Sequence, residues 1–393
     1  MISFALDPDQ TLIQETLREF AKNELAPQAR SAESARQPSA ALKKGHAELG
    51  MQHIDLPESL GGQGATLCTT VVAEEELGWG DAALALALDA GYPGTLFLAL
   101  ARETGAEVGA VALAYCEPKG PAVGFGTTAR CVDGGFAITG RKGWVADAAS
   151  AQRFIVFAQL DGTEGWRGAA AFLVERGAQK EGALRVGPQQ RMLGLEAVSV
   201  SEVMFEECRV AESALLCSGD ALISVTRRMF ARVGLKNAAR QVGLARAAYE
   251  LALEYTQERK AFGKPVAHFQ ANAFMLADMA TDVDAARWLL WRAATVLDKA
   301  SEPPKPTDDL RVISDAIVHA GEVAWRTADR GVQLLGGAGF VQDFPAEKRM
   351  RDTKALALVG APAEWWRLDA AGQHLGHAIE SALPSAAMQT FIL

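Results

Sequence analysis

Apolar side chains recur at intervals of three and four along the first quarter of the chain, as on the buried face of a helix. The clearest of these positions are Leu12, Ile13, Leu17 and Phe20. Asp7 and Gln10, three residues apart, form a capping pair that predicts where the first helix starts. A turn-rich stretch over residues 56–64 interrupts the helical spacing, which then resumes. We expect an N-terminal helical domain over residues 1–106.

Short apolar runs replace the helical spacing between residues 107 and 210. The runs GFAITG, RFIVFAQL, AAAFLVE and SEVMFEE are separated by turn-forming residues, which is typical of strands. The run over residues 154–159 is apolar on both alternating faces, so its orientation stays open. We expect a middle β domain over residues 107–210.

Helical periodicity returns over residues 211–393, in stretches that cover residues 222–258, 270–299 and 310–335. The segment 301–309 contains three prolines and predicts a solvated connector. Five large side chains at helical spacing predict bundle core rather than a cofactor site. They are Phe274, Met275, Met279, Trp288 and Trp291. The whole chain therefore predicts an α+β multidomain protein.

Composition narrows the classes of function. The chain has 393 residues and a formal net charge of -9, and its basic residues are scattered, which argues against a nucleic-acid partner. We find no membrane-spanning run and no signal-peptide pattern at the start. The 5 cysteines form no CxxC pair, which predicts reduced thiols, a cytoplasmic location and no metal site. They are Cys68, Cys116, Cys131, Cys208 and Cys217.

Two long motifs carry the most information. YTQERKAFGKPVAHFQ covers residues 255–270, and QLLGGAGF covers residues 333–340. Each alone could be a helix end or a glycine C-cap. Together, in this order and at this distance, they resemble the FAD-binding signature of the acyl-CoA dehydrogenase family. The resemblance covers essentially the whole chain and implies an N-terminal helical domain, a middle β-barrel domain and a C-terminal four-helix bundle.

The resemblance also implies the residues that hold FAD. Those at the diphosphate end contact the FAD seated in the neighbouring subunit and are Arg259, Phe262, Gly263, Gln270, Gln333, Gly336 and Gly337. Trp144 is added to the cofactor-binding residues because it matches the family's Trp-Ile-Thr stretch beside the flavin ring. The arginine fork suits phosphate oxygens, and the paired glycines let backbone N–H groups approach closely.

The family's catalytic glutamate has no counterpart at either of its two known positions. By resemblance these positions hold Gly360 and Val233, and neither side chain can take the α-proton of an acyl thioester. Glu364, one helical turn beyond Gly360, is the nearest carboxylate, although a carboxylate in a first helical turn also complements the helix dipole. The catalytic residues therefore stay unknown.

The flavin-ring side departs from the family as well. Cys116 and Ala146 stand where relatives have threonines that face the ring, and neither supplies an equivalent donor. In the loop over residues 192–200, Glu196 replaces a cation and Val200 a hydroxyl. The chain thus keeps the groups it would lend to a neighbour and loses those it would use itself.

We interpret the chain as an FAD-binding oxidoreductase of the acyl-CoA dehydrogenase fold that desaturates an acyl thioester as the base-lacking subunit of a mixed oligomer. The alternative is a stand-alone homo-oligomer with a displaced base or different flavin chemistry. The substrate carrier would be coenzyme A or an acyl-carrier protein, and an electron-transfer flavoprotein would accept the electrons. A flavin-free scaffold would leave Arg259 and Gln333 unexplained.

Overall fold

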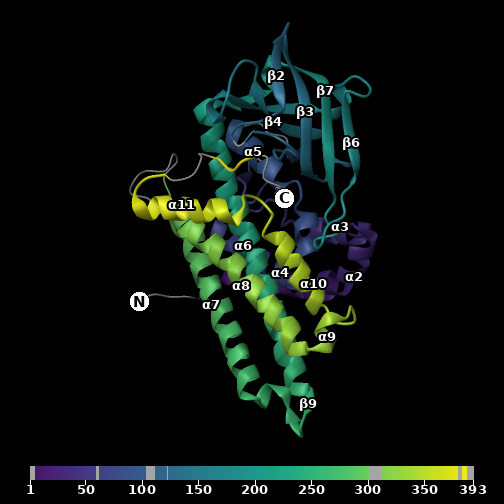
Figure 1. The fold of residues 1–393 in the computed structure, drawn as a ribbon, viewed down its shortest axis with the longest axis vertical. Helices are drawn as coiled ribbons and strands as arrows, with labels where there is room; N and C mark the ends of the chain where they lie inside the picture. Colours follow the sequence, from purple (N-terminus) through teal and green to yellow (C-terminus); the bar gives the residue numbers. More distant parts are fainter. Residues whose placement is uncertain are drawn as a thin grey trace.

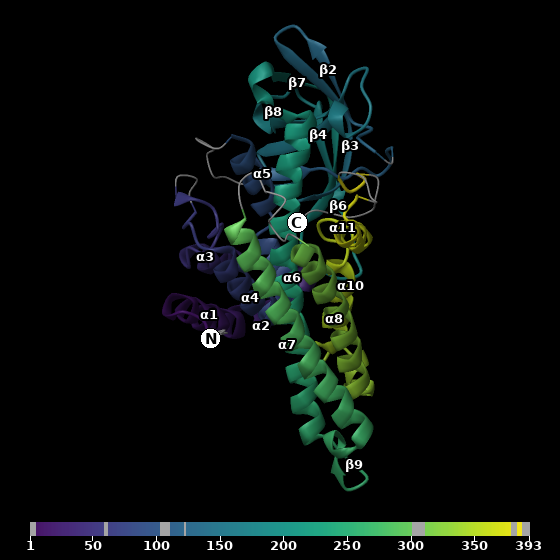
Figure 2. The ribbon, with the colours of Figure 1, turned by 90° about the vertical axis from the view of Figure 1, so that its left-hand side faces the viewer.

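A computed structural model describes residues 5–58, 62–102, 111–121, 123–300, 311–378 and 383–386. The expected succession of helical, sheet and helical regions is confirmed, with the sheet at one end of the molecule and the long helices running to the other (Figures 1 and 2). The expected boundary at residues 106 and 107, the connector 301–309 and part of the turn 56–64 lie outside the described residues.

The N-terminal helices begin at the predicted capping pair. The Asp7 side chain accepts a hydrogen bond from the Gln10 N–H at 2.8 Å, and the Gln10 side chain accepts one from the Asp7 N–H at 3.2 Å. A break at Asp81, whose φ of -165° is not helical, bends the fourth helix. The elements are α1 (Pro8–Phe20), a π-helical turn (Ala21–Leu25), α2 (Ala26–Ala35), α3 (Ala40–Glu48), α4 (Leu67–Leu88) and α5 (Tyr92–Arg102).

The middle region is an 8-stranded mixed sheet in the order β6-β7-β3-β2-β4-β5-β8, with β1 paired to β4. Its strands are β1 (Val111–Ala114), β2 (Thr128–Val132), β3 (Gly135–Ala146), β4 (Arg153–Leu160), β5 (Ala169–Glu175), β6 (Leu184–Gln189), β7 (Val200–Ala211) and β8 (Leu215–Ser218). Strand β8 pairs with β5, so the sheet continues beyond residue 210, where the sequence placed its end. A four-residue strand is too short to show the alternation that identifies longer ones.

Both faces of β4 are buried, which explains its continuous apolar sequence. Phe154 and Val156 pack into the core of the sheet, whereas Ile155 and Phe157 pack towards α5 and α6. A strand covered on both sides reads as an unbroken apolar run.

The three long C-terminal helices, α6 to α8, agree with the sequence prediction to within three residues at each end, and the shorter helices follow them. They are α6 (Gly219–Glu258), α7 (Gln270–Lys299), α8 (Arg311–Leu335), α9 (Gly337–Phe340), α10 (Ala346–Leu356) and α11 (Ala363–Leu375), with a small hairpin of β9 (Lys260–Ala261) and β10 (Lys264–Pro265). The core prediction holds for Met279 but is wrong for Phe274 and Trp288, which are 61% and 37% exposed. Trp288 lies at a surface pocket that Gln10 and Cys68 also line.

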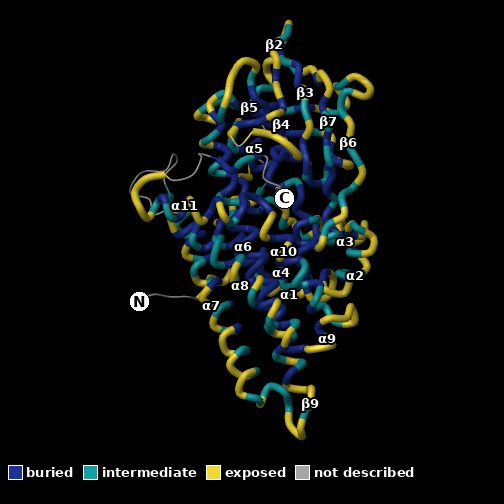
Figure 3. The backbone as a smooth tube through the Cα atoms, in the orientation of Figure 1, coloured by how far each residue is buried: buried dark blue, intermediate teal, exposed yellow. Residues whose placement is uncertain are grey.

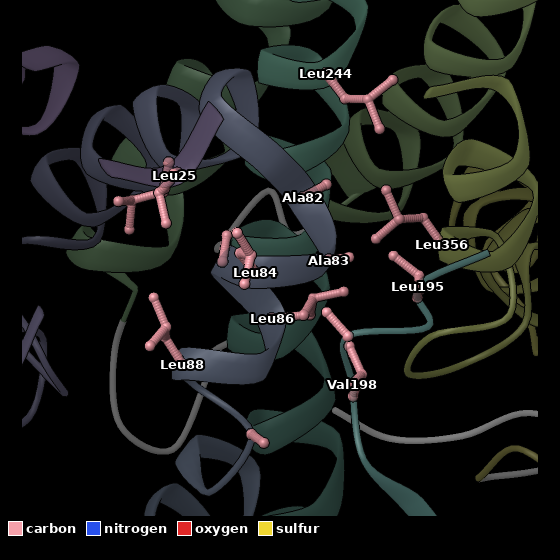
Figure 4. Close-up of a cluster of buried hydrophobic side chains, with 14 of the residues drawn as sticks. Leu25, Ala82, Ala83, Leu84, Leu86, Leu88, Leu195, Val198, Leu244 and Leu356 are labelled. Atoms are coloured by element: carbon pink, nitrogen blue, oxygen red, sulfur yellow. The ribbon is translucent and has the colours of Figure 1, made fainter. Parts of the chain in front are cut away.

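All three regions share one core, which fixes them against one another. This interdomain cluster joins Leu25 and Leu84 of the helical region, Leu195 from a loop of the middle region, Leu244 of α6 and Leu356 of α10 (Figure 4). Figure 3 shows buried backbone at this central level and through the sheet, with exposed segments towards β9. The central packing leaves both ends of the molecule free to project outwards.

Within the described ranges, no single helix is long and apolar enough to cross a membrane. The bent pair α4 and α5 passes by length and composition, and almost all of it is buried inside the protein. The same part of the chain contains no group of three His, Cys, Asp or Glu side chains that could hold a metal ion.

Candidate functional site

The first motif forms an exposed tip where α6 ends. The α6 helix stops at Glu258, and Arg259 turns the chain into the β9–β10 hairpin, where its carbonyl accepts the N–H of Val266 at 2.8 Å. Gly263 and Phe262 form the turn, with φ of 83° and 51°. Phe262 is also 97% exposed. A left-handed backbone conformation costs a phenylalanine about 1–2 kcal/mol. A strained and almost fully exposed phenylalanine is typical of a surface that binds a partner or ligand.

The second motif reverses the chain after α8. Gly336 adopts a φ of 59° and its N–H donates to the carbonyl of Gln333 at 3.1 Å. At Gly339 a Cβ would lie 2.4 Å from the Val332 carbonyl oxygen, so packing within the chain requires glycine there. Gly337 differs, because its φ is ordinary and an added Cβ would meet nothing within 4 Å. Its own chain places no demand on this glycine, which leaves its backbone open to a ligand from outside.

The structure brings the two motifs together. Leu334 and Leu335 pack with Ala252 and Leu276 in a small distal cluster, and the rings of Tyr255 and Phe344 meet edge to face at 5.6 Å beside it. The predicted diphosphate residues are all exposed around this end, and they are Arg259, Phe262, Gln270, Gln333, Gly336 and Gly337. Among the described residues Arg259 makes no ion pair with Glu254 or Glu258.

Trp144 is not brought to this place. It lies in β3 at a register shift between Lys142 and Val145, with a φ of 56°, packed between the interdomain cluster and a second cluster around α5 and α6. Figure 1 places β3 and β9 at opposite ends of the long helices. One chain therefore cannot bring its own Trp144 and its own Arg259 to the same flavin.

The ring-side residues are buried. Cys116 and Ala146 are each 2% exposed. Beside them Glu117 forms a buried ion pair with Lys142 at 2.8 Å and also accepts the N–H groups of Gly126 and Thr127. Burial raises the pKa of Glu117, but the Lys142 charge and these hydrogen bonds outweigh burial and hold its pKa below the usual range.

The two positions of the missing base lie side by side. A Cβ built on Gly360 would be 3.9 Å from Cγ1 of Val233 and 3.8 Å from Nδ2 of Asn237. Gly360 has a φ of 81°, a backbone conformation that residues other than glycine seldom adopt. The amide nitrogen of Asn237 is buried without a hydrogen-bond partner, while its oxygen accepts from Arg240 at 2.9 Å. Two positions far apart in sequence thus converge on one buried spot.

Glu364 does not face this spot. It is exposed in the first turn of α11, where a carboxylate complements the helix dipole. Glu196 is also engaged structurally, because it pairs with Arg36 at 3.1 Å and accepts the Met192 N–H at 2.9 Å. Both carboxylates therefore have structural partners or surroundings that explain them without catalysis.

A buried ion network between α4 and α6 was missed from the sequence. Arg240 donates to Glu74 at 2.7 Å and to Asp89 at 2.5 Å, and Lys236 pairs with the same two carboxylates. The Lys236 ammonium also lies 3.5 Å from the Tyr92 ring centroid. The only available signal was the spacing of Lys236 and Arg240, four residues apart on an otherwise apolar helix face. This network fills the space next to Asn237 with fixed charge.

FAD fits one half of this site in a single chain. The diphosphate-end residues fit, because Arg259 is exposed and the backbone at Gly337 is open. The ring-side residues cannot contact a flavin ring in this conformation, because Cys116 and Ala146 are buried in the packed core. When bound, FAD would supply the acceptor for a hydride.

Comparison with known proteins identifies the family. Residues 7–103, 112–208 and 223–373 match the family models for the N-terminal, middle and C-terminal domains of acyl-CoA dehydrogenase. The chain is 30% identical over 389 residues to the mitochondrial short-chain specific acyl-CoA dehydrogenase of Sus scrofa, covering 95% of this chain and 92% of that protein. The chain belongs to the acyl-CoA dehydrogenase family, whose members bind FAD.

Solved structures agree. A glutaryl-coenzyme A dehydrogenase in complex with glutaryl-CoA superposes with a TM-score of 0.86 at 25% identity, covering 98% of this chain and 99% of that one. A glutaryl-CoA dehydrogenase from Mycobacterium smegmatis, solved with FADH2, shares the fold at a TM-score of 0.82 and 22% identity, covering 95% of this chain and 96% of that one. The fold of this chain is therefore that of the family along its full described length.

Proposed function

We propose that this chain is the base-lacking subunit of a mixed oligomer that α,β-desaturates an acyl thioester. It lends its diphosphate-binding residues to a flavin seated in a related partner chain, which carries the catalytic glutamate and the ring-side contacts. The acyl carrier is coenzyme A or an acyl-carrier protein, and an electron-transfer flavoprotein accepts the electrons.

The main support for the proposal is a difference in exposure: the diphosphate-binding residues are exposed, whereas the ring-side and base positions are buried. Arg259 has no ion pair with its neighbouring glutamates among the described residues, and the backbone of Gly337 faces open space. Away from this tip, Cys116, Ala146 and Val233 are at most 2% exposed. A chain that held a flavin of its own would need these ring-side residues to be accessible.

The absence of a base supports the same conclusion. An α C–H is a weak acid, and a positioned general base contributes about 10² to 10⁴-fold to such a step. Gly360 offers no side chain, Val233 offers only methyl groups, and Glu364 points into solvent. The isolated chain is therefore expected to turn over simple acyl-CoAs negligibly.

The test compares the mixed assembly with the isolated chain. Arg259→Ala, made only in this chain, should lower the FAD retained by the assembly, and Lys260→Ala, which removes an exposed positive charge from the adjacent residue, serves as the matched control. FAD content is read by absorbance after gel filtration. Turnover by the isolated chain at about 1 to 10³ per second, a normal enzymatic rate, would overturn the proposal and favour a stand-alone homo-oligomer with a displaced base.

A further inference from the structure

A short segment near the C-terminus packs against the ring-side strand. The Tyr115 hydroxyl donates to the carbonyl of Pro384, and the Glu117 N–H donates to the carbonyl of Ala386 at 2.8 Å. Leu383 and Ala386 are both 0% exposed. These hydrogen bonds join positions on either side of Cys116 to residues about 270 positions further along the chain.

The same segment closes one continuous hydrophobic cluster, which we call the ring-side cluster. Leu383 and Ala386 belong to it, and so do Cys116, Val233 and Ala361. The ring-facing position and the base position of the family therefore lie in one packed body together with this C-terminal segment. Their exposed fractions lie between 0% and 6%, which leaves no room for a planar ring or a thioester among them.

We propose that residues 383–386 are an intramolecular plug that shuts the flavin-ring and thioester side of this chain's own site. The proposal rests on the proposed function, because it explains why the chain lends flavin contacts but holds no flavin of its own. Flavin enters this site only when the plug is withdrawn.

Two backbone carbonyls, those of Pro384 and Ala386, and the buried side chain of Leu383 anchor the plug. Burial holds the pKa of Tyr115 well above its usual range, so its hydroxyl remains a proton donor to Pro384 throughout the physiological range. Its ring meets Phe125, Phe157 and Phe230 edge to face at 5.0 to 5.6 Å, which fixes where the hydroxyl points. A charge placed at Leu383 would lie within a hydrophobic cluster and would expel the segment.

The test uses three variants of the isolated full-length chain. Leu383→Asp should release the plug, Tyr115→Phe should loosen it while keeping the ring, and His377→Asp adds the same charge at an exposed position just before the segment. Two quantities are measured: hydrogen exchange at the Glu117 amide, and binding of FAD followed by quenching of its fluorescence.

In the native chain we expect a protected Glu117 amide and no saturable FAD binding. Leu383→Asp should accelerate exchange and give saturable FAD binding at least tenfold tighter than the limit measured for the native chain, with Tyr115→Phe in between and His377→Asp unchanged. The plug is overturned if Leu383→Asp frees the Glu117 amide without any gain in FAD binding. It is equally overturned if the amide exchanges freely in the native chain, or stays protected in Leu383→Asp.

The plug and the proposed function fail in different ways. Tight FAD binding by the native isolated chain would overturn the plug. The proposed function would still hold if Arg259→Ala depletes FAD from the mixed assembly. If Arg259→Ala leaves the FAD content of that assembly unchanged while Leu383→Asp gains FAD, the proposed function is overturned and the plug is supported.

Discussion

Substitutions at Gly360 test its backbone conformation and the missing catalytic base separately. Gly360 has a φ of 81°, and a Cβ there would sit 3.9 Å from Val233. Space is therefore available for a methyl group, but the backbone conformation is unfavourable by about 1–2 kcal/mol for any residue with a Cβ. Gly360→Ala should lower the free energy of unfolding by about that amount.

Gly360→Glu should cost more than Gly360→Ala, because it adds a carboxylate to a spot whose nearest polar atom is the amide nitrogen of Asn237. It should not create a dehydrogenase, because Cys116 and Ala146 still fail to orient a flavin and the ring-side cluster stays closed. Reacting groups displaced by even about 1 Å lose rate steeply.

The assay is urea unfolding followed by circular dichroism, together with turnover of a simple acyl-CoA. Gly337→Ala is the matched control, because its φ is ordinary and its Cβ meets nothing, so its stability should be unchanged or raised by up to about 1 kcal/mol. Equal stability of the two alanine variants would refute the conformational argument. Robust turnover by Gly360→Glu with bound FAD would show that the glutamate is the only group missing.

Three further predictions follow from individual contacts. Arg259→Ala should weaken FAD retention in the mixed assembly about ten- to a hundred-fold, from about 1.5–3 kcal/mol for a charge-assisted hydrogen bond, and Arg259→Lys should recover only part of it; unchanged affinity by FAD titration would make the motif purely structural. Glu117→Gln should leave Lys142 buried without its counter-charge and destabilise the fold by about 3–5 kcal/mol, measured by urea unfolding. Because the pKa of Glu117 is lowered in the folded protein, its contribution to stability is present above pH 4.5 and is lost as the pH falls through that lowered value. A stability difference that does not change with pH would contradict this. Burial raises the pKa of Cys217 to about 12, so iodoacetamide at pH 8 should modify the exposed Cys131 far faster than Cys217, and equal rates by mass spectrometry would contradict the burial.

The long helices could be predicted from sequence because their apolar spacing is sustained over many turns. The bounds of α7, Gln270–Lys299, agree with the sequence pattern at both ends. The short strand Leu215–Ser218 could not be predicted, since four residues carry no distinguishable period. Phe274 shows another limit: helical spacing says that a residue lies on an apolar face, but not whether this chain or another covers that face.

The site divides in the same way. Arg259 and Gly337 could be proposed from sequence because their chemistry is local to two motifs, and their contact with FAD stays a prediction. The convergence of Gly360 on Val233, and the contact of Pro384 with Tyr115, could not, because they join residues more than 100 positions apart through packing. Periodicity carries no information about such pairs.

The FAD content per chain of the isolated protein, compared with that of its complex with a glutamate-bearing relative, decides whether this chain lends its contacts to a partner's flavin. We expect essentially no FAD on the isolated chain and one FAD for each pair of unlike chains in the complex, with that FAD held about ten- to a hundred-fold less tightly when Arg259 of this chain is replaced by alanine. One FAD per chain in the isolated protein, bound as tightly as in the complex, would contradict it.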